Sequence, residues 1–152
     1  MGNFMLLNAL KLEAQKTGPL LAELILAAPD VDRDLFIQYA PDVREIVAGM
    51  TLYASSADRA LLASKEVARG FPRAGDVPAE GPLVLPRMDT IDVTAIGNEI
   101  FGLNHDVFAT KRALINDMGG LLEGRRPPNT RLREIWPVPD SPPPPRYWRF
   151  VP

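Results

Sequence analysis

The stretch LLAELILAAPDVD, residues 20–32, decides the fold class of this chain. It opens with a nearly continuous apolar run, interrupted by Glu23, and it closes with Pro29 and two aspartates. An apolar run of this kind suits a strand that is covered on both faces, as in a parallel sheet. Asp32 stands where it can cap a following helix. The stretch therefore predicts one strand-to-helix step of an α/β sheet.

Helices are predicted on both sides of this strand. Residues 3–16 are apolar around most of the helix circumference, which is typical of a helix buried in the middle of a fold. A glycine and a proline then end that helix. After the strand, we expect one short helix over residues 33–39, ended by Pro41, and a second around residues 43–48.

The same alternation continues along the chain as far as residue 122. Further strands are predicted at residues 50–54, 83–85 and 90–93, further helices at about 59–68 and 109–122, and a loop at 70–82. Because helices and strands alternate, this order favours an α/β sheet over a helical bundle or an all-β sandwich.

The last part of the chain has a different composition. More than half of the 16 prolines lie in residues 127–152, and four of them are consecutive, at residues 142–145. Such a segment is expected to be extended, and its aromatic residues suggest that it packs back onto the domain. We therefore divide the chain into a domain of residues 1–124 and a proline-rich tail of residues 125–152.

Composition excludes several classes of function. The chain has 17 Lys and Arg against 19 Asp and Glu, which argues against a nucleic-acid binder. It has no cysteine and one histidine, His105, so we expect no metal site, and we expect no cofactor. No apolar run approaches the roughly 20 residues that span a bilayer. Since no targeting segment is evident, we expect a soluble protein, cytoplasmic by default.

Two residues are placed where part of a Ser-His-Asp triad would lie. Open parallel sheets bind ligands at the carboxyl ends of their strands. Asp58 follows the strand at 50–54, and His105 follows the strand at 90–93. In a triad the acid orients the imidazole, and the imidazole takes the serine proton and returns it to the leaving group. The order acid before histidine is that of α/β-hydrolases.

The nucleophile of such a triad is missing from the sequence. In α/β-hydrolases it lies in a G-x-S-x-G elbow between a strand and a buried helix. Met1 and Gly2 match the last two positions of that motif and lead directly into a helix of the buried type. We therefore expect the serine immediately before Met1, and we expect the chain as written to be inactive.

Several segments resemble a bacterial α/β-hydrolase family of uncharacterised substrate. They are MGNF at 1–4, APDVD at 28–32, LYASSAD at 52–58, RAG at 73–75, MDTIDV at 88–93 and YWRF at 147–150. In that family the helix follows an H-S-M-G-N elbow, and a G-H-S-like segment carries the histidine.

The resemblance implies the C-terminal half of an α/β-hydrolase fold, with a mostly parallel sheet flanked by helices. It implies a serine hydrolase that acts on a small acyl substrate, which is a carboxylic ester, thioester or amide. Asp58 would be the triad acid and His105 the base. The backbone N–H of Met1 would be one oxyanion donor, because Met1 follows the serine.

Each of these residues also has a simpler interpretation. Asp58 can be the N-cap of the helix that follows it. His105 can be a surface loop residue. Asp30 and Asp32 are the competing acids, because some hydrolases place the acid one strand earlier. Asp30 is the alternative acid of the two, since helix capping is the stronger interpretation of Asp32. Ser55 and Ser56 lack a surrounding G-x-S-x-G motif, so we interpret them as turn and capping residues.

A second hypothesis belongs to another class of function. The chain would then be a non-catalytic remnant, and a partner chain would supply the missing strands in trans. Under either hypothesis the sheet needs completing, by an N-terminal half or by a partner. An in-frame His-Ser codon pair directly upstream of Met1 would favour the hydrolase, and a stop codon there would favour the remnant.

Overall fold

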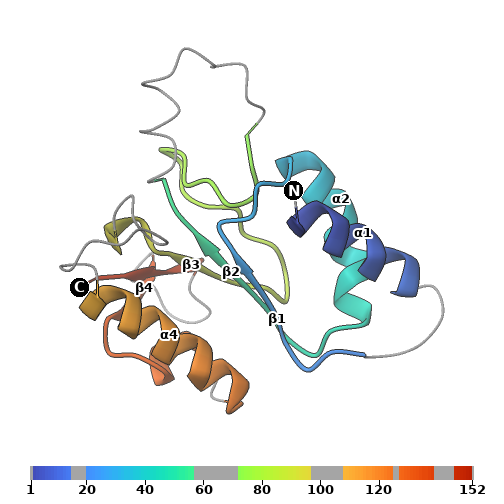
Figure 1. Cartoon of the computed structure of the whole chain (residues 1–152). Coiled ribbons are helices and arrows are strands. Elements are labelled where there is room, and N and C mark those ends of the chain that lie inside the picture. The colour runs from blue at the N-terminus through green and yellow to red at the C-terminus, as the bar shows by residue number, and fades with distance from the viewer. Residues whose placement is uncertain are drawn as a thin grey trace.

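A five-stranded sheet forms the centre of the structure, which is a computed structural model (Figure 1). The structure describes residues 2–14, 20–56, 72–96, 108–124, 127–138 and 146–151. The strands lie in the order β1 (Leu24–Ala27), β2 (Met50–Ala54), β3 (Asp89–Asp92), β5 (Tyr147–Phe150) and β4 (Ile135–Val138). The first four of these are parallel, and β4 runs antiparallel to β5. The sheet is therefore mostly parallel, as the sequence predicts.

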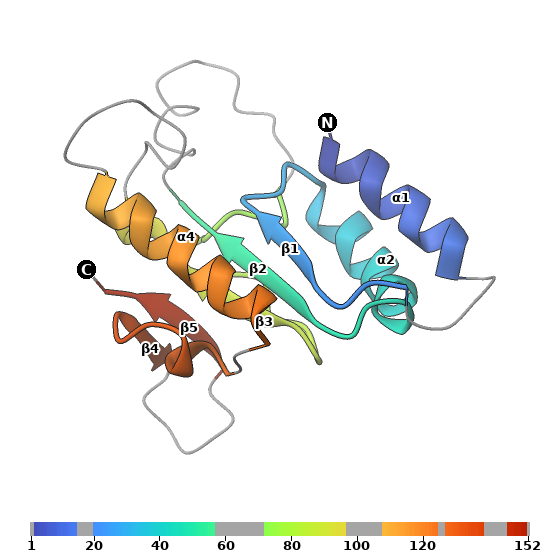
Figure 2. The ribbon, with the colours of Figure 1, turned by 60° about the horizontal axis from the view of Figure 1, so that its bottom comes forward.

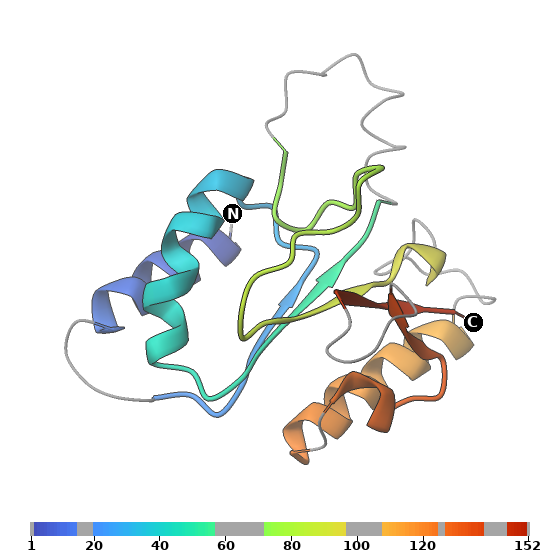
Figure 3. The same cartoon turned by 180° about the vertical axis from the view of Figure 1, so that it is seen from behind.

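Helices cover both faces of this sheet. The helices α1 (Gly2–Ala14) and α2 (Arg33–Glu45) lie on one face, and α4 (Phe108–Leu122) lies on the other (Figures 2 and 3). Two short 3-10 helices, Thr94–Ile96 and Pro128–Thr130, complete the helical elements of the described residues. This layering is that of a partial α/β-hydrolase fold. Among the described residues, no helix is long and apolar enough to cross a membrane.

Each face of the sheet has its own apolar core. The core under α1 and α2 contains Leu24, Leu26, Met50, Leu52 and Phe36. The core under α4 contains Tyr53, Ile91, Leu114, Leu121, Trp148 and Phe150. The alternation of Leu52 and Tyr53 between the two cores follows from the strand repeat, in which successive side chains point to opposite faces.

The strand prediction was correct at β2 and wrong at residues 83–85. All five residues of β2 are buried, and its bounds are those expected from the sequence. Leu83 is also buried, but within residues 72–96 only 89–92 form a strand. The Leu83 carbonyl accepts a hydrogen bond from the Thr90 side chain at 2.8 Å. The backbone of Leu83 is therefore held at β3 by the side chain of Thr90, and it does not add a strand to the sheet.

The prediction of two short helices at 33–39 and 43–48 was wrong. A single helix, α2, spans Arg33–Glu45 and contains Pro41. A proline inside a helix leaves the carbonyl four residues earlier without its usual donor. Here both Pro41 and Ile37 are exposed, so that carbonyl lies on the side of the helix that faces water. Burial of Phe36, Ala40 and Val43 on the opposite side holds the helix together.

The tail contributes two strands that the sequence analysis did not predict. Trp148 and Phe150 of β5 point into the core under α4, as does Ile135 of β4. Pro137 stands in β4, the outermost strand on that side. The Val151 N–H donates to the Glu134 carbonyl at 2.7 Å. Because backbone groups alternate sides along a strand, the Pro137 nitrogen then faces the open side of β4, where proline is tolerated.

Candidate active site at the carboxyl edge of the sheet

The carboxyl ends of β1, β2 and β3 meet at one edge of the sheet, and α1 begins at the same edge (Figure 1). The strands are aligned there, since Ala27 is opposite Tyr53 and Ala54 is opposite Asp92. Open parallel sheets bind their ligands at this edge. It is therefore the candidate active site.

Three of the residues predicted for the site lie outside the described residues. They are Met1, Asp58 and His105. Asp58 comes shortly after Ser56, which follows β2, and His105 comes shortly before Phe108, where α4 begins. The roles given to Met1, Asp58 and His105 stay predictions.

A short strap joins the ends of β1 and β2. The Gly75 N–H donates to the Pro29 carbonyl at 3.1 Å, and the Gly75 carbonyl accepts from the Ser55 N–H at 2.9 Å. The backbones lie so close that a Cβ on Gly75 would stand 2.6 Å from the Ala28 carbonyl carbon. Only glycine fits this approach without a shift of the backbone.

The strap continues along the start of α2. The Ala74 N–H donates to the Val31 carbonyl, and the Arg33 N–H donates to the Pro72 carbonyl, both at 2.8 Å. The segment Arg73-Ala74-Gly75 thus fastens the turn after β1 to the end of β2. The sequence analysis used this segment only as part of a resemblance. Its pairing could not be foreseen, because about 45 residues separate it from β1 along the chain.

The ends of β2 and β3 are joined in a similar way. The Val93 N–H donates to the Ala54 carbonyl at 2.8 Å. One residue pair further, the Ser56 N–H donates to the Thr94 hydroxyl at 3.0 Å. Asp92 holds Thr94 in place, because its Oδ1 accepts from the Thr94 N–H at 3.0 Å. The backbone therefore leaves β2 and β3 side by side as far as Ser56 and Thr94.

Asp92 is also tied to the tail. Its Oδ2 accepts a hydrogen bond from Arg149 Nε at 3.1 Å, and Arg149 Nη2 lies 2.9 Å from the Tyr147 hydroxyl. The Asp92 side chain is buried, whereas that of Arg149 is about half exposed. This ion pair links β5 to the carboxyl end of β3, so it places the tail at the border of the candidate site.

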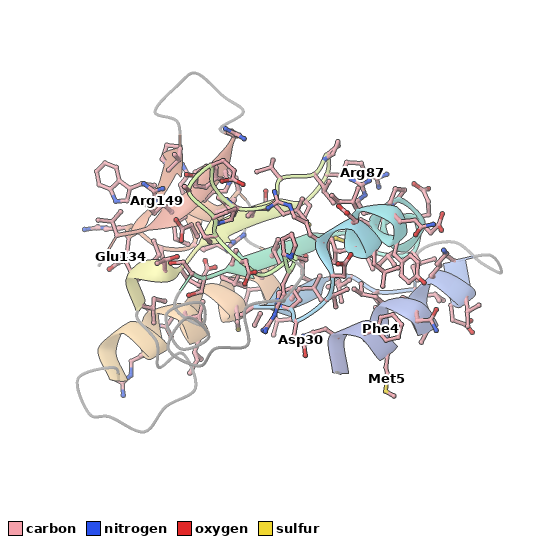
Figure 4. All side chains as sticks on the ribbon, turned by 90° about the horizontal axis from the view of Figure 1, so that it is seen from above. Phe4, Met5, Asp30, Arg87, Glu134 and Arg149 are labelled. Atoms are coloured by element: carbon pink, nitrogen blue, oxygen red, sulfur yellow. The ribbon has the colours of Figure 1, made fainter. Side chains whose placement is uncertain are left out.

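Asp30, the alternative acid, is exposed and lies beside the beginning of α1 (Figure 4). A hydrogen bond from the amino terminus of the chain lowers the pKa of Asp30, and burial opposes this effect. The charge of the amino terminus and a hydrogen bond from the Asn3 side chain lower the pKa further. Asp30 is therefore a carboxylate directed at the start of α1.

Asp32 has the capping role that the sequence predicts. Its Oδ1 accepts a hydrogen bond from the Leu35 N–H at 2.9 Å, in the first turn of α2. The two aspartates after β1 therefore act on different helices. Asp30 is directed at α1, and Asp32 begins α2.

Comparison with protein families shows which family has this arrangement. A family described as alpha/beta hydrolases of unknown function (DUF900) matches residues 1–126. The chain belongs to this family. Comparison with the curated proteins gave no match, and comparison with the solved structures gave none either. The sheet order, the covering helices and the shared carboxyl edge of this α/β hydrolase agree with the family match.

Within the described ranges, no group of three or more His, Asp or Glu side chains is arranged to hold a metal ion. Polar groups at the carboxyl edge of this α/β hydrolase include Asp30, Ser55, Ser56, Asp92 and Thr94. Of these, Ser56, Asp92 and Thr94 hold the edge together through the hydrogen bonds described above.

Proposed function

We propose that this chain is the C-terminal part of a serine hydrolase that cleaves a carboxylic ester, thioester or amide. One observation carries the proposal. The start of α1 and the ends of β2 and β3 lie at one edge of the sheet. In an α/β hydrolase these are the places of the nucleophile, the acid and the histidine. The substrate would be a small acyl compound.

In this proposal each residue has a defined chemical role. The serine Oγ attacks the acyl carbonyl while His105 accepts the serine proton. The negative charge that develops on the carbonyl oxygen is stabilised by the backbone N–H of Met1 and by a second donor. His105 then donates the proton to the leaving group, and an acyl-enzyme forms. Asp58 orients the imidazole and stabilises its charged form. Water, deprotonated by His105, hydrolyses the acyl-enzyme and regenerates the serine.

The position proposed for the serine is directly before Met1. Helix α1 packs on the same face as α2, which connects β1 to β2. Parallel crossovers are almost always right-handed, so successive crossover helices on one face connect strands that are added in one direction. A strand before α1 would then pair with the side of β1 that has no neighbour in the described sheet. The turn between that strand and α1 is where the elbow belongs.

The test begins with the reading frame upstream of Met1. We expect a Ser codon immediately before Met1, preceded by the codons of an apolar strand. The longer protein should hydrolyse 4-nitrophenyl esters of short acids and should react with a fluorophosphonate. Asp58→Asn and His105→Ala should each lower kcat by roughly 10³-fold to 10⁴-fold, as expected of triad members.

Asp30→Asn is the matched control for the acid. It removes the charge of the neighbouring candidate and should lower kcat far less than Asp58→Asn, since Asp30 does not orient the imidazole in this triad. Full activity of Asp58→Asn with loss of activity in Asp30→Asn would transfer the acid role to Asp30. An upstream stop codon, or a longer protein that reacts with no acyl substrate, would refute the hydrolase and favour the non-catalytic remnant.

A further inference from the structure

A buried polar cluster lies between β2 and α4. Tyr53 of β2 donates its hydroxyl proton to Asp117 Oδ2. Arg131, which follows the 3-10 helix Pro128–Thr130, donates from Nε to Asp117 Oδ1 at 2.7 Å and from Nη2 to Oδ2 at 3.3 Å. The side chains of Arg131 and Asp117 are 0% and 1% exposed. We call Tyr53, Asp117 and Arg131 the clasp.

The clasp lies inside the apolar core under α4. Burial and the charge of Asp117 raise the pKa of Tyr53, so the tyrosine stays a hydrogen-bond donor at neutral pH. Gly120 leaves room for the third member, because a Cβ there would stand 3.3 Å from the Arg131 Cβ. The aliphatic part of Arg131 thus crosses α4 where α4 has no side chain. The crossing fixes how the segment after α4 passes over the helix.

The three members of the clasp come from the three segments that border the candidate site. Tyr53 lies in β2, which leads to Asp58. Asp117 lies in α4, which begins shortly after His105. Arg131 leads to β4 and β5, and Arg149 of β5 pairs with Asp92 at the end of β3. The family match ends at residue 126, so Arg131 lies outside it, whereas Tyr53 and Asp117 lie inside.

We propose that Arg131 is a positioning residue of the hydrolase. It pairs with Asp117 and, through Asp117, with Tyr53, and it thereby fixes α4 relative to β2. This fixes how β2, which leads to Asp58 along the chain, lies relative to α4, which follows His105 along the chain. The inference rests on the proposed function, because Asp58 and His105 must act together for their separation to matter.

Stability alone is a poor explanation for the clasp. Buried ion pairs are often replaced by well-packed apolar residues with no loss of stability, because desolvation of the two charges offsets their attraction. Arg131 Nη1 is buried and has no hydrogen-bond partner within the described part of the chain, which adds to this cost. The two-pronged pairing of a guanidinium with a carboxylate does fix direction as well as distance. Fixed geometry is therefore what the clasp provides.

The test separates geometry from stability. The triple variant Tyr53→Phe, Asp117→Leu, Arg131→Met replaces the clasp with apolar side chains, to be made in the longer protein. We expect it to fold with an unfolding midpoint close to that of the parent. Its kcat should fall about tenfold to a hundredfold with KM unchanged, because small displacements of reacting groups cost this much. Arg131→Lys, made alone in the longer protein, keeps the positive charge but lacks the planar guanidinium. Its kcat should lie between that of the triple variant and that of the parent.

The pH profile gives a second readout that a purely structural role would not move. If the acid lies further from the imidazole, the charged imidazolium is less stabilised and the histidine pKa falls. The acidic limb of the kcat/KM profile of the triple variant should therefore shift to lower pH. The matched control is Arg87→Met, which removes the exposed ion pair of Arg87 with Glu45 and should change neither kcat nor the pH profile.

The outcomes distinguish this inference from the proposed function. A longer protein that is inactive and unlabelled before any substitution would refute the hydrolase, and the positioning role with it. An active parent with a folded triple variant of unchanged kcat and unchanged pH profile would refute the positioning role alone. A fall in kcat that equals the fall in the folded fraction, measured by circular dichroism, would reduce the clasp to a stabilising contact and would also overturn the inference.

Discussion

The half of the molecule around β1 and the half around β4 are held together by different kinds of contact. On the side of β1, the structure relies on apolar packing under α1 and α2 and on the backbone hydrogen bonds of the strap at Gly75. On the side of β4, a buried ion pair of Asp117 and Arg131 joins α4 to the tail. The first side depends on close fit, and the second adds a buried ion pair to its apolar core. A substitution should therefore lower the free energy of unfolding most where it leaves a buried charge without its partner.

Arg131→Met should have the largest effect on stability. It leaves Asp117 buried without its counter-charge, and breaking a buried pair in this way costs about 3–5 kcal/mol. Urea denaturation of the chain followed by circular dichroism measures the loss. Arg133→Met is the matched control, because Arg133 is exposed and two residues away, and it should stay within about 0.5 kcal/mol of the parent. Equal losses of unfolding free energy in the two variants would show that the buried ion pair does not stabilise the half of the molecule around β4.

Gly75→Ala should have the next largest effect. The added methyl group would stand 2.6 Å from backbone atoms of Ala28 and Pro29, so the strap has to move. Overpacking of this kind costs about 1–3 kcal/mol. The same substitution at Gly119, where nothing lies within 4 Å, should stabilise α4 by about 0.5–1 kcal/mol, because alanine is the better helix former. The pair of variants is compared by thermal unfolding, and a stable Gly75→Ala variant would show that the strap is not tightly fitted.

Asp32→Ala should cost about 1 kcal/mol, because it removes the side-chain acceptor for the Leu35 N–H at the start of α2. Urea denaturation measures this loss. Asp32→Ser keeps an oxygen in the capping position and should restore most of the stability. If serine and alanine were equally destabilising, the hydrogen bond to Leu35 would not be the cause.

Asp30→Asn should have the smallest effect, less than about 1 kcal/mol at pH 7, because Asp30 is exposed and solvent screens its charge. The folded state lowers the pKa of Asp30, so its carboxylate stabilises the fold above the unfolded-state pKa of about 4. That contribution is lost as the pH falls through the folded-state pKa. The free energies of unfolding of parent and variant should therefore differ at pH 7 and converge at low pH. A difference that persists at low pH would point to a cause other than charge.

Local sequence patterns predicted the parts of the fold that depend on local properties. The strand at 50–54 is correct because five consecutive buried residues mark it, and Asp32 is correct because a capping aspartate needs only the helix that follows it. Pro41 predicted the end of a helix but lies inside α2, because burial of the opposite side of α2 outweighs the lost hydrogen bond. The strands of the tail were missed since the prolines around them favour an extended arm.

The candidate site was predicted as an edge of the sheet, and this edge is present. What the sequence could not reveal are the pairings between distant residues that build it. The strap, the contact of Ser56 with Thr94, and the clasp each join segments that lie far apart in the chain. No local pattern encodes such a pairing. The residues named for catalysis, Asp58 and His105, lie outside the described residues, so their roles stay predictions from chain order and from the resemblance of the sequence.

Pro137 has a consequence for how copies of this chain can associate. Its nitrogen carries no hydrogen and faces the open side of β4, so that side lacks a donor that an incoming strand would need. β1, at the opposite border of the described sheet, contains no proline. A strand added to this sheet would therefore pair with β1, where the proposed preceding strand belongs, and Pro137 guards the β4 border against strands of other copies.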